Sequence, residues 1–209
     1  GVAGAAIASP VSNIVGLVWI AAYFYGPKAY LHLAPATWKP RFDTWKRMLA
    51  IGLPTGFEFT MMAVYMMIVY SVSRPFGPAA QAGFGIGQRI IQAGFMPVVA
   101  LGFAVAPVAG QNFGARLPQR VRATFKDAAL MATGMMLFLT IVCHLIPGPL
   151  VGVFSSDLAV TAVGGEYLEI ISWNFVASGL IFVASSMFQA MGNTMPWLIA
   201  SAARITLVA

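Results

Sequence analysis

Long apolar runs separated by short polar connectors make up this chain from its first residues to its last. A helix of about 20 apolar residues crosses a hydrocarbon core of roughly 30 Å, because each residue adds 1.5 Å. Proline, glycine and charged residues mark the ends of the runs. The pattern predicts an all-α, polytopic transmembrane bundle of about six spanning helices. The expected helices cover residues 2–25, 48–73, 79–113, 127–146, 166–191 and the stretch from 196 onward.

Lys and Arg gather in two of the connectors, residues 27–47 and 114–126. The connector at Arg74 has no other basic residue, and the connector 147–165 has none. Cytoplasmic loops of multi-pass membrane proteins carry such an excess of basic residues. We therefore expect both basic connectors to lie in the cytoplasm and the first helix to start outside.

Composition excludes several classes of protein. With 59% hydrophobic and 9% charged residues and a mean hydropathy of +0.82, the chain has too few polar side chains to cover a soluble globule. The net charge of +6 does not indicate nucleic-acid binding, because the basic residues lie in loops between apolar runs. A single cysteine, Cys143, excludes an intramolecular disulfide and a Cys-rich metal site.

No enzyme is expected either. The two histidines, His32 and His144, are far apart and belong to no HExxH motif, and a nucleophile with a nearby base is lacking. We expect no cofactor. Both ends of the sequence look truncated, since it starts directly with an apolar run and stops within one at Ala209.

Glu58 is the most informative residue, because it falls about ten residues into the predicted second helix. Insertion scales put the cost of an acidic residue at mid-membrane at about 2.5–3.5 kcal/mol, so such residues face a polar interior and are protonated or paired. Glu58 is therefore a candidate coupling residue for a proton or cation. A structural glutamate bonded to a neighbouring helix is the alternative.

Polar residues in the third helix form a second candidate group. Gln88 and Gln92 are four residues apart and Arg89 lies between them, so they predict a polar stripe facing the bundle interior. Arg89 would pair with Glu58 or with carbonyls freed by prolines. Nearby Gly83, Gly85 and Gly87 are small residues that favour close helix packing.

Asn174 and Ser178 are four apart in the predicted fifth helix and are candidates for lining a cavity, or for bonding helices together. Glu166 and Glu169 are expected in the first turn of that helix, where the helix dipole favours acidic residues.

Several strings, in this order, resemble segments of MATE (multidrug and toxic compound extrusion) transporters. The stretch IGQRIIQAGFMPVVALGFAVAPVAGQNFGA is similar to the eighth helix of that family, including its GQNxGA element. IGLPTGFEF and GVAGAAIASPVSNIVG are similar to the seventh and sixth helices, and MFQAMGNTMPWLI to the turn between the tenth and eleventh. The resemblance covers essentially the whole chain as the C-terminal half of a NorM-like transporter.

The resemblance implies a bundle of two six-helix lobes that alternates between inward and outward openings. Residues 1–26 would be the last helix of the N-terminal lobe, 27–47 the cytoplasmic connector, and 48–209 the C-terminal lobe without its final helix. The implied function is multidrug efflux of cationic or amphiphilic drugs by antiport with H⁺ or Na⁺, as a monomer in the bacterial inner membrane, and with the lipid bilayer as the other partner.

In NorM-like members a cation site uses a glutamate on the seventh helix with an aspartate and a tyrosine on the tenth. Glu58 matches the glutamate, but Ser178 and Asn174 stand near the other two positions. The resemblance therefore leaves a proton at Glu58 as plausible as Na⁺ near it. Two other functions stay open, a lipid-linked oligosaccharide flippase of the same superfamily and a structural membrane subunit.

Overall fold

The computed structural model describes residues 2–25, 41–195 and 199. Within these ranges, the side chains of residues 2, 3, 5, 47, 51, 54, 55, 58 and 59 are not described. The predicted helix from 196 onward lies outside this part of the chain, apart from residue 199, as does His32 in the first connector.

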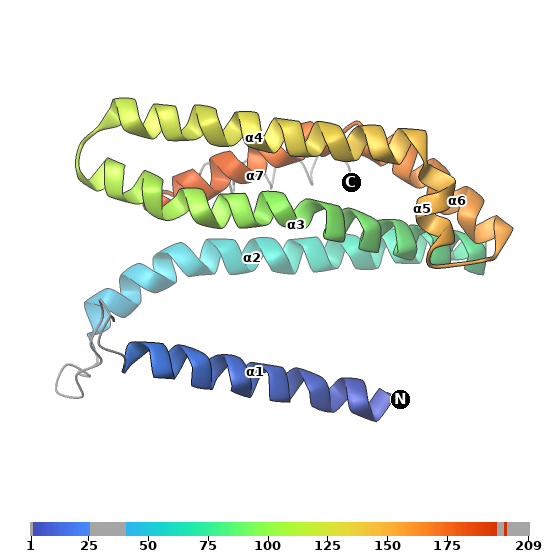
Figure 1. The fold of residues 1–209 in the computed structure, drawn as a ribbon, viewed down its shortest axis with the longest axis horizontal. Helices are drawn as coiled ribbons and strands as arrows, with labels where there is room; N and C mark the ends of the chain where they lie inside the picture. The colour runs from blue at the N-terminus through green and yellow to red at the C-terminus, as the bar shows by residue number, and fades with distance from the viewer. Residues whose placement is uncertain (1, 26–40, 196–198, 200–209) are drawn as a thin grey trace. The chain divides into compact units, whose positions relative to one another are not determined.

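Every element of the described residues is a helix, as the apolar runs predicted (Figure 1). The elements are α1 (Val2–Phe24), α2 (Phe42–Ser73), the 3₁₀ helix η2 (Arg74–Phe76), α3 (Pro78–Gly114), α4 (Pro118–Leu145), α5 (Pro147–Gly152), α6 (Leu158–Ser172) and α7 (Phe175–Ala190).

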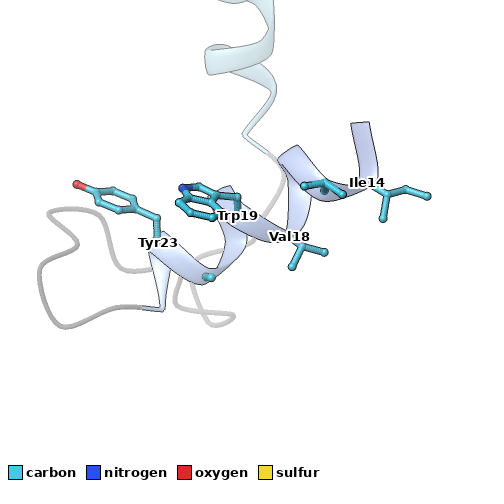
Figure 2. A pocket seen from close by; sticks show the side chains of 6 residues that line it. Ile14, Val18, Trp19 and Tyr23 are labelled. Atoms are coloured by element: carbon cyan, nitrogen blue, oxygen red, sulfur yellow. The ribbon is translucent and has the colours of Figure 1, made fainter. Parts of the chain in front are cut away.

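The chain divides into two units, residues 1–46 and 47–209, and each is described by itself. In the first unit, α1 exposes most of its apolar side chains, including Trp19 at 78%. An open apolar groove of about 500 Å³ follows one side of this helix (Figure 2). It is lined by Ile14, Val15, Val18, Trp19, Ala22 and Tyr23.

The core of the second unit lies among α3, α4, α6 and α7. α3 contacts the other three, α4 also contacts α6 and α7, and α5 packs on α6. The long helices α3 and α4 run side by side along the bundle (Figure 1). Apolar side chains from all of these helices fill the centre. The buried core is Val98, Val105, Ala109, Ala128, Ala132, Met136, Cys143, Val151, Leu168, Phe175, Val183 and Met187.

Glycines allow α3 and α6 to approach closely. A Cβ on Gly83 would lie 2.9 Å from the amide nitrogen of Gly164 and 3.0 Å from the carbonyl oxygen of Val160. Both are backbone atoms, so only a residue without a side chain fits at this crossing. The predicted role of Gly83 in close helix packing is confirmed.

Prolines start three of the helices. Pro78, Pro118 and Pro147 stand in the first turn of α3, α4 and α5, where a fixed φ favours the helix and no amide hydrogen is needed. The prediction that the fourth helix starts at residue 127 was wrong, because Pro118 starts it within the predicted connector 114–126. The basic residues of that connector therefore belong largely to the first turns of α4.

The prediction of a connector over residues 147–165 was also wrong. It contains α5 and the first half of α6. Asp157 starts α6 by accepting a 2.9 Å hydrogen bond from the amide of Ala159. Glu166 and Glu169 consequently lie well inside α6, where both are exposed, and not in its first turn.

The predicted helix 166–191 is broken. α6 ends at Ser172, α7 starts at Phe175, and the two axes differ by 57°. By length and composition, Ala6–Phe24, Pro78–Gly114 and Pro118–Leu145 can each cross a membrane, and the bent pair α6–α7 can serve as a fourth span. The described residues therefore confirm an all-α bundle of membrane-spanning helices.

Candidate functional site

Glu58 lies near the middle of α2, a helix of 32 residues. Its side chain is outside the described part of the structure. The helical position agrees with the sequence analysis, while the role of the carboxylate stays a prediction.

Gln88 forms the main polar contact between α3 and α6. Its side chain is half-buried, and Nε2 donates a 2.9 Å hydrogen bond to the hydroxyl oxygen of Tyr167. Gly87 makes room for this contact, since a Cβ there would lie 2.5 Å from the Tyr167 ring. Sequence analysis identified Gln88 but missed Tyr167, because an aromatic residue 79 positions away gives no local signal.

Three aromatic rings extend this contact to α2. Phe84 packs edge-to-face against Tyr70 at 5.2 Å and against Tyr167 at 5.1 Å between ring centroids. Gln81 Nε2 donates a 3.3 Å hydrogen bond to the carbonyl oxygen of Tyr70. Such edge-to-face pairs are favourable beyond the area they bury. The rings fix the end of α2 against α3 and α6.

Arg89 and Gln92 do not face the interior of the described bundle. Both are exposed, whereas Gln88 is half-buried, so the three side chains do not form one buried stripe within the described residues, and their role in lining a cavity of the complete bundle stays a prediction. The contact with α6 is made by Gly83 and Gly87 and the neighbouring Gln88. Successive helical residues are about 100° apart, which turns Arg89 away from that contact. Pairing of Arg89 with Glu58 is untested, because the Glu58 side chain is not described.

Asn174 and Ser178 lie at the start of α7, not inside one continuous helix. Asn174 is the residue before α7 and is exposed, and its carbonyl oxygen accepts a 2.9 Å hydrogen bond from the amide of Ser178. Ser178 is half-buried. The two residues therefore lie on either side of the start of α7, and not on one face of a continuous helix.

Polar side chains from α4 contact Ser172, the last residue of α6 before the break. Thr140 Oγ1 lies 3.0 Å from the carbonyl oxygen of Ser172 and 2.8 Å from that of Met136. His144 Nδ1 lies 3.0 Å from the carbonyl oxygen of Thr140 and 3.1 Å from Ser172 Oγ. Ser172 is completely buried. The His144 ring also packs edge-to-face against Trp173 at 4.8 Å.

The protons of this cluster can be assigned from the acceptors. Ser172 Oγ donates to the carbonyl oxygen of Glu169 at 2.9 Å, so its lone pairs face His144. Because Nδ1 of His144 then faces only oxygen acceptors, it carries a hydrogen and donates. The sequence held a signal for this cluster, since a histidine inside an apolar run is a functional or structural pairing site.

A second open cavity, of about 440 Å³, lies where α2, η2 and the first turn of α3 meet. Sequence analysis did not identify it, because its walls come from both sides of a turn. The lining residues are Met66, Met67, Tyr70, Ser71, Arg74 and Gln81.

Among the described residues no group of three or more His, Cys, Asp or Glu side chains could hold a metal ion. This finding does not extend to the Glu58 carboxylate, so a Na⁺ ion near Glu58 stays a prediction.

Comparison with known proteins decides the family. The family model described as MatE matches residues 54–209, which is most of the chain and nearly all of the second unit. The chain belongs to the MATE family. Members are membrane transporters and not enzymes, in agreement with the sequence analysis.

Two bacterial relatives of this chain are named for drug resistance. "Probable multidrug resistance protein YpnP" of Bacillus subtilis is 28% identical over 198 residues, covering 91% of this chain and 44% of the relative. "Probable multidrug resistance protein NorM" of Thermotoga maritima is 24% identical over 196 residues, covering 94% and 42%. The chain thus spans less than half the length of these relatives.

A solved MATE structure supports the fold. The outward-facing conformation of a multidrug resistance MATE family transporter of the MOP superfamily matches with a TM-score of 0.86 and 23% identity, over 95% of this chain and 45% of the other. At this identity the match establishes the fold alone. The predicted similarity to one half of a MATE transporter is confirmed.

Proposed function

We propose that this chain is the C-terminal half of a secondary active antiporter that exports cationic or amphiphilic drugs in exchange for H⁺ or Na⁺. The observation that carries the proposal is a lone acidic residue at the middle of α2 in a chain of the MATE family. Glu58 is the only Asp or Glu between Asp43 and Asp127, a stretch that includes most of α2 and all of α3.

A carboxylate at that depth has two states with different charges. Desolvation favours the protonated, neutral form, and a bound cation or drug favours the negative form. If the outward-open and inward-open conformations bind the proton with different affinity, protonation shifts the balance between them. The same negative charge would attract a cationic drug, so proton or Na⁺ entry and drug exit would compete at Glu58.

The proposed substrates follow from the names of the relatives and from this charge. Both relatives are named for multidrug resistance. A bacterial inner membrane is the proposed location, because the relatives are bacterial and three of the described helices, with the bent pair α6–α7 as a fourth span, are long and apolar enough to cross a membrane. We further propose that the protein acts as a monomer.

The first test is drug efflux by the complete product of the gene in drug-sensitised bacteria. Ethidium export would be compared between native protein and Glu58→Gln at equal membrane abundance, under separate proton and sodium gradients. We expect Glu58→Gln to abolish export without loss of folded protein, because an amide keeps the shape of the side chain but cannot carry the charge. Asp157→Asn is the matched control, since Asp157 lies in the exposed turn before α6.

The gradient that drives native export identifies the coupling ion. Equal export by native protein and Glu58→Gln would contradict a coupling role and make Glu58 structural. Failure of the native protein to export any drug would favour the oligosaccharide flippase instead.

A further inference from the structure

The cavity between α2, η2 and α3 combines a cationic wall with an apolar one. Arg74, Ser71 and Gln81 supply hydrogen-bond donors at one end, and Met66 and Met67 supply apolar surface. Along α2 the distance from residue 67 to residue 74 is two helical turns, or roughly 10 Å. The cavity is therefore amphipathic along the helix axis.

The charged end of this cavity lies at the membrane surface. α3 has 37 residues, hence a length of roughly 55 Å, which exceeds a hydrocarbon core of roughly 30 Å. Both ends of α3 must then reach the headgroup region, and Arg74 lies only four residues before its start. Phe76, in the same turn, is 76% exposed, as aromatic residues at membrane interfaces often are.

The charge of the cavity does not suit the cationic drugs proposed above. Among the residues that the structure describes, its lining contains Arg74 and no acidic residue. Glu58 lies eight residues before Met66 on α2, roughly 12 Å away along the axis. A guanidinium in a wall without a carboxylate attracts anions, and phosphate is the anion whose geometry it matches best.

We propose that this cavity binds a membrane phospholipid, with its phosphate on Arg74 and Ser71 and its upper acyl chain along Met66 and Met67. The Tyr70 ring forms the wall between the two ends. The ring is held by Phe84, and the Tyr70 carbonyl oxygen accepts hydrogen bonds from Gln81 Nε2 and, at 2.9 Å, from Ser73 Oγ. A flexible thioether surface suits an acyl chain of variable shape.

Such a lipid would anchor the turn between α2 and α3 at the membrane surface. It would also keep the Arg74 charge neutralised at the interface, without any need for a protein carboxylate. The proposal concerns lipid binding alone and does not depend on which ion or drug the transporter carries.

The test is photocrosslinking of the complete gene product in an uncharged maltoside detergent, which supplies no competing phosphate. The probe is phosphatidylglycerol with a diazirine near the top of one acyl chain, and labelled positions are located by mass spectrometry. We expect labelling of the α2 segment 66–71, and a decrease of roughly fivefold in Arg74→Gln, because one interfacial Arg contributes about 1 kcal/mol to binding anionic lipid.

Two variants, a second probe and one competitor separate the explanations. Arg74→Lys should keep most of the labelling, and Arg120→Gln, an exposed charge at the start of α4, should leave labelling of segment 66–71 unchanged. A diacylglycerol probe without phosphate should label this segment weakly and equally in native protein and Arg74→Gln. Excess inorganic phosphate should not displace the lipid probe.

Equal labelling of native protein and Arg74→Gln by phosphatidylglycerol would overturn the proposal. Strong labelling by diacylglycerol would reduce the site to an apolar groove, and displacement by inorganic phosphate would make free phosphate the ligand. Because Arg74 is exposed, unchanged thermal unfolding of Arg74→Gln is expected and excludes misfolding as the cause.

Discussion

Gly83 shows how a single missing side chain determines where two helices meet. The backbone of α6 lies so close to it that an added methyl group would touch the Gly164 nitrogen and the Val160 oxygen. Backbone atoms within a helix cannot move aside individually, so the helices would have to separate. The same argument does not apply to Gly134 on α4, where nothing lies within 4 Å of a built Cβ.

We therefore expect opposite results from two chemically identical substitutions. Gly83→Ala should lower the free energy of unfolding by about 1–3 kcal/mol, as overpacking does. Gly134→Ala should be neutral or raise it by about 0.5–1 kcal/mol, because alanine favours the helix more than glycine. Circular dichroism during unfolding by SDS in mixed micelles measures both. A loss at Gly134 equal to that at Gly83 would show that the close approach is not the cause.

Gln88 and Tyr167 show the limit of reading residues from sequence. A glutamine in an apolar run must find a partner, and the sequence analysis selected it on that ground. Its partner could not be named, because the α3–α6 contact depends on glycines at both helices and on the turn of each helix. The exposure of Arg89 in the described residues could not be predicted for the same reason, since the direction of its side chain follows from the position of that contact.

At the scale of elements, the polar groups at the break between α6 and α7 find hydrogen-bond partners on another helix, α4. Ending α6 at Ser172 leaves carbonyl oxygens without partners in the helix, and lipid cannot supply any. Thr140 on α4 lies 3.0 Å from one of them, the carbonyl oxygen of Ser172, and His144 on the same helix contacts the Ser172 hydroxyl. The chain can therefore bend by 57° within the bundle.

Thr140→Val tests this bridge, because it removes the hydroxyl and nearly preserves the shape. We expect Thr140→Val to lower the free energy of unfolding by about 1–3 kcal/mol, as is usual when a buried acceptor is left without a hydrogen bond. Thr124→Val is the matched control: Thr124 also donates to the carbonyl four residues earlier, but near the exposed start of α4. It should cost less than about 0.5 kcal/mol. Similar losses in both would mean that the bond across to Ser172 contributes nothing.

Apolar length predicted which segments are helices far better than where they end. The spans of α1 and α3 follow directly from their apolar runs. The break at residues 173–174 could not be predicted, because its stabilising partners lie about 30 positions earlier on α4. The start of α6 had a local signal, because Asp157 precedes an apolar run. The sequence analysis considered residues 147–165 only as a connector without basic residues and did not use this signal.

For the whole molecule, the distribution of basic residues predicts how the lobe is oriented. Arg116, Arg120, Arg122 and Lys126 lie where α3 meets α4, whereas the turn from α2 to α3 has only Arg74. The one cysteine of this chain, Cys143, is buried, so it adds little background to the labelling of a cysteine introduced on the surface.

We expect a membrane-impermeant maleimide to label Phe76→Cys on intact cells, and to label Gln119→Cys only after permeabilisation. Both positions are exposed, so accessibility within the protein is matched. The reverse pattern would contradict the positive-inside orientation. It would also move the Arg74 cavity to the cytoplasmic leaflet.

The bent pair also has a consequence for biosynthesis. α6 has 15 residues and α7 has 16, and each is shorter than the roughly 20 residues that carry a segment into the bilayer by itself. The ribosome makes α4 before either of them. Thr140 and His144 are thus already in place when the two short helices leave the translocon, and the nascent pair can dock onto them as one unit.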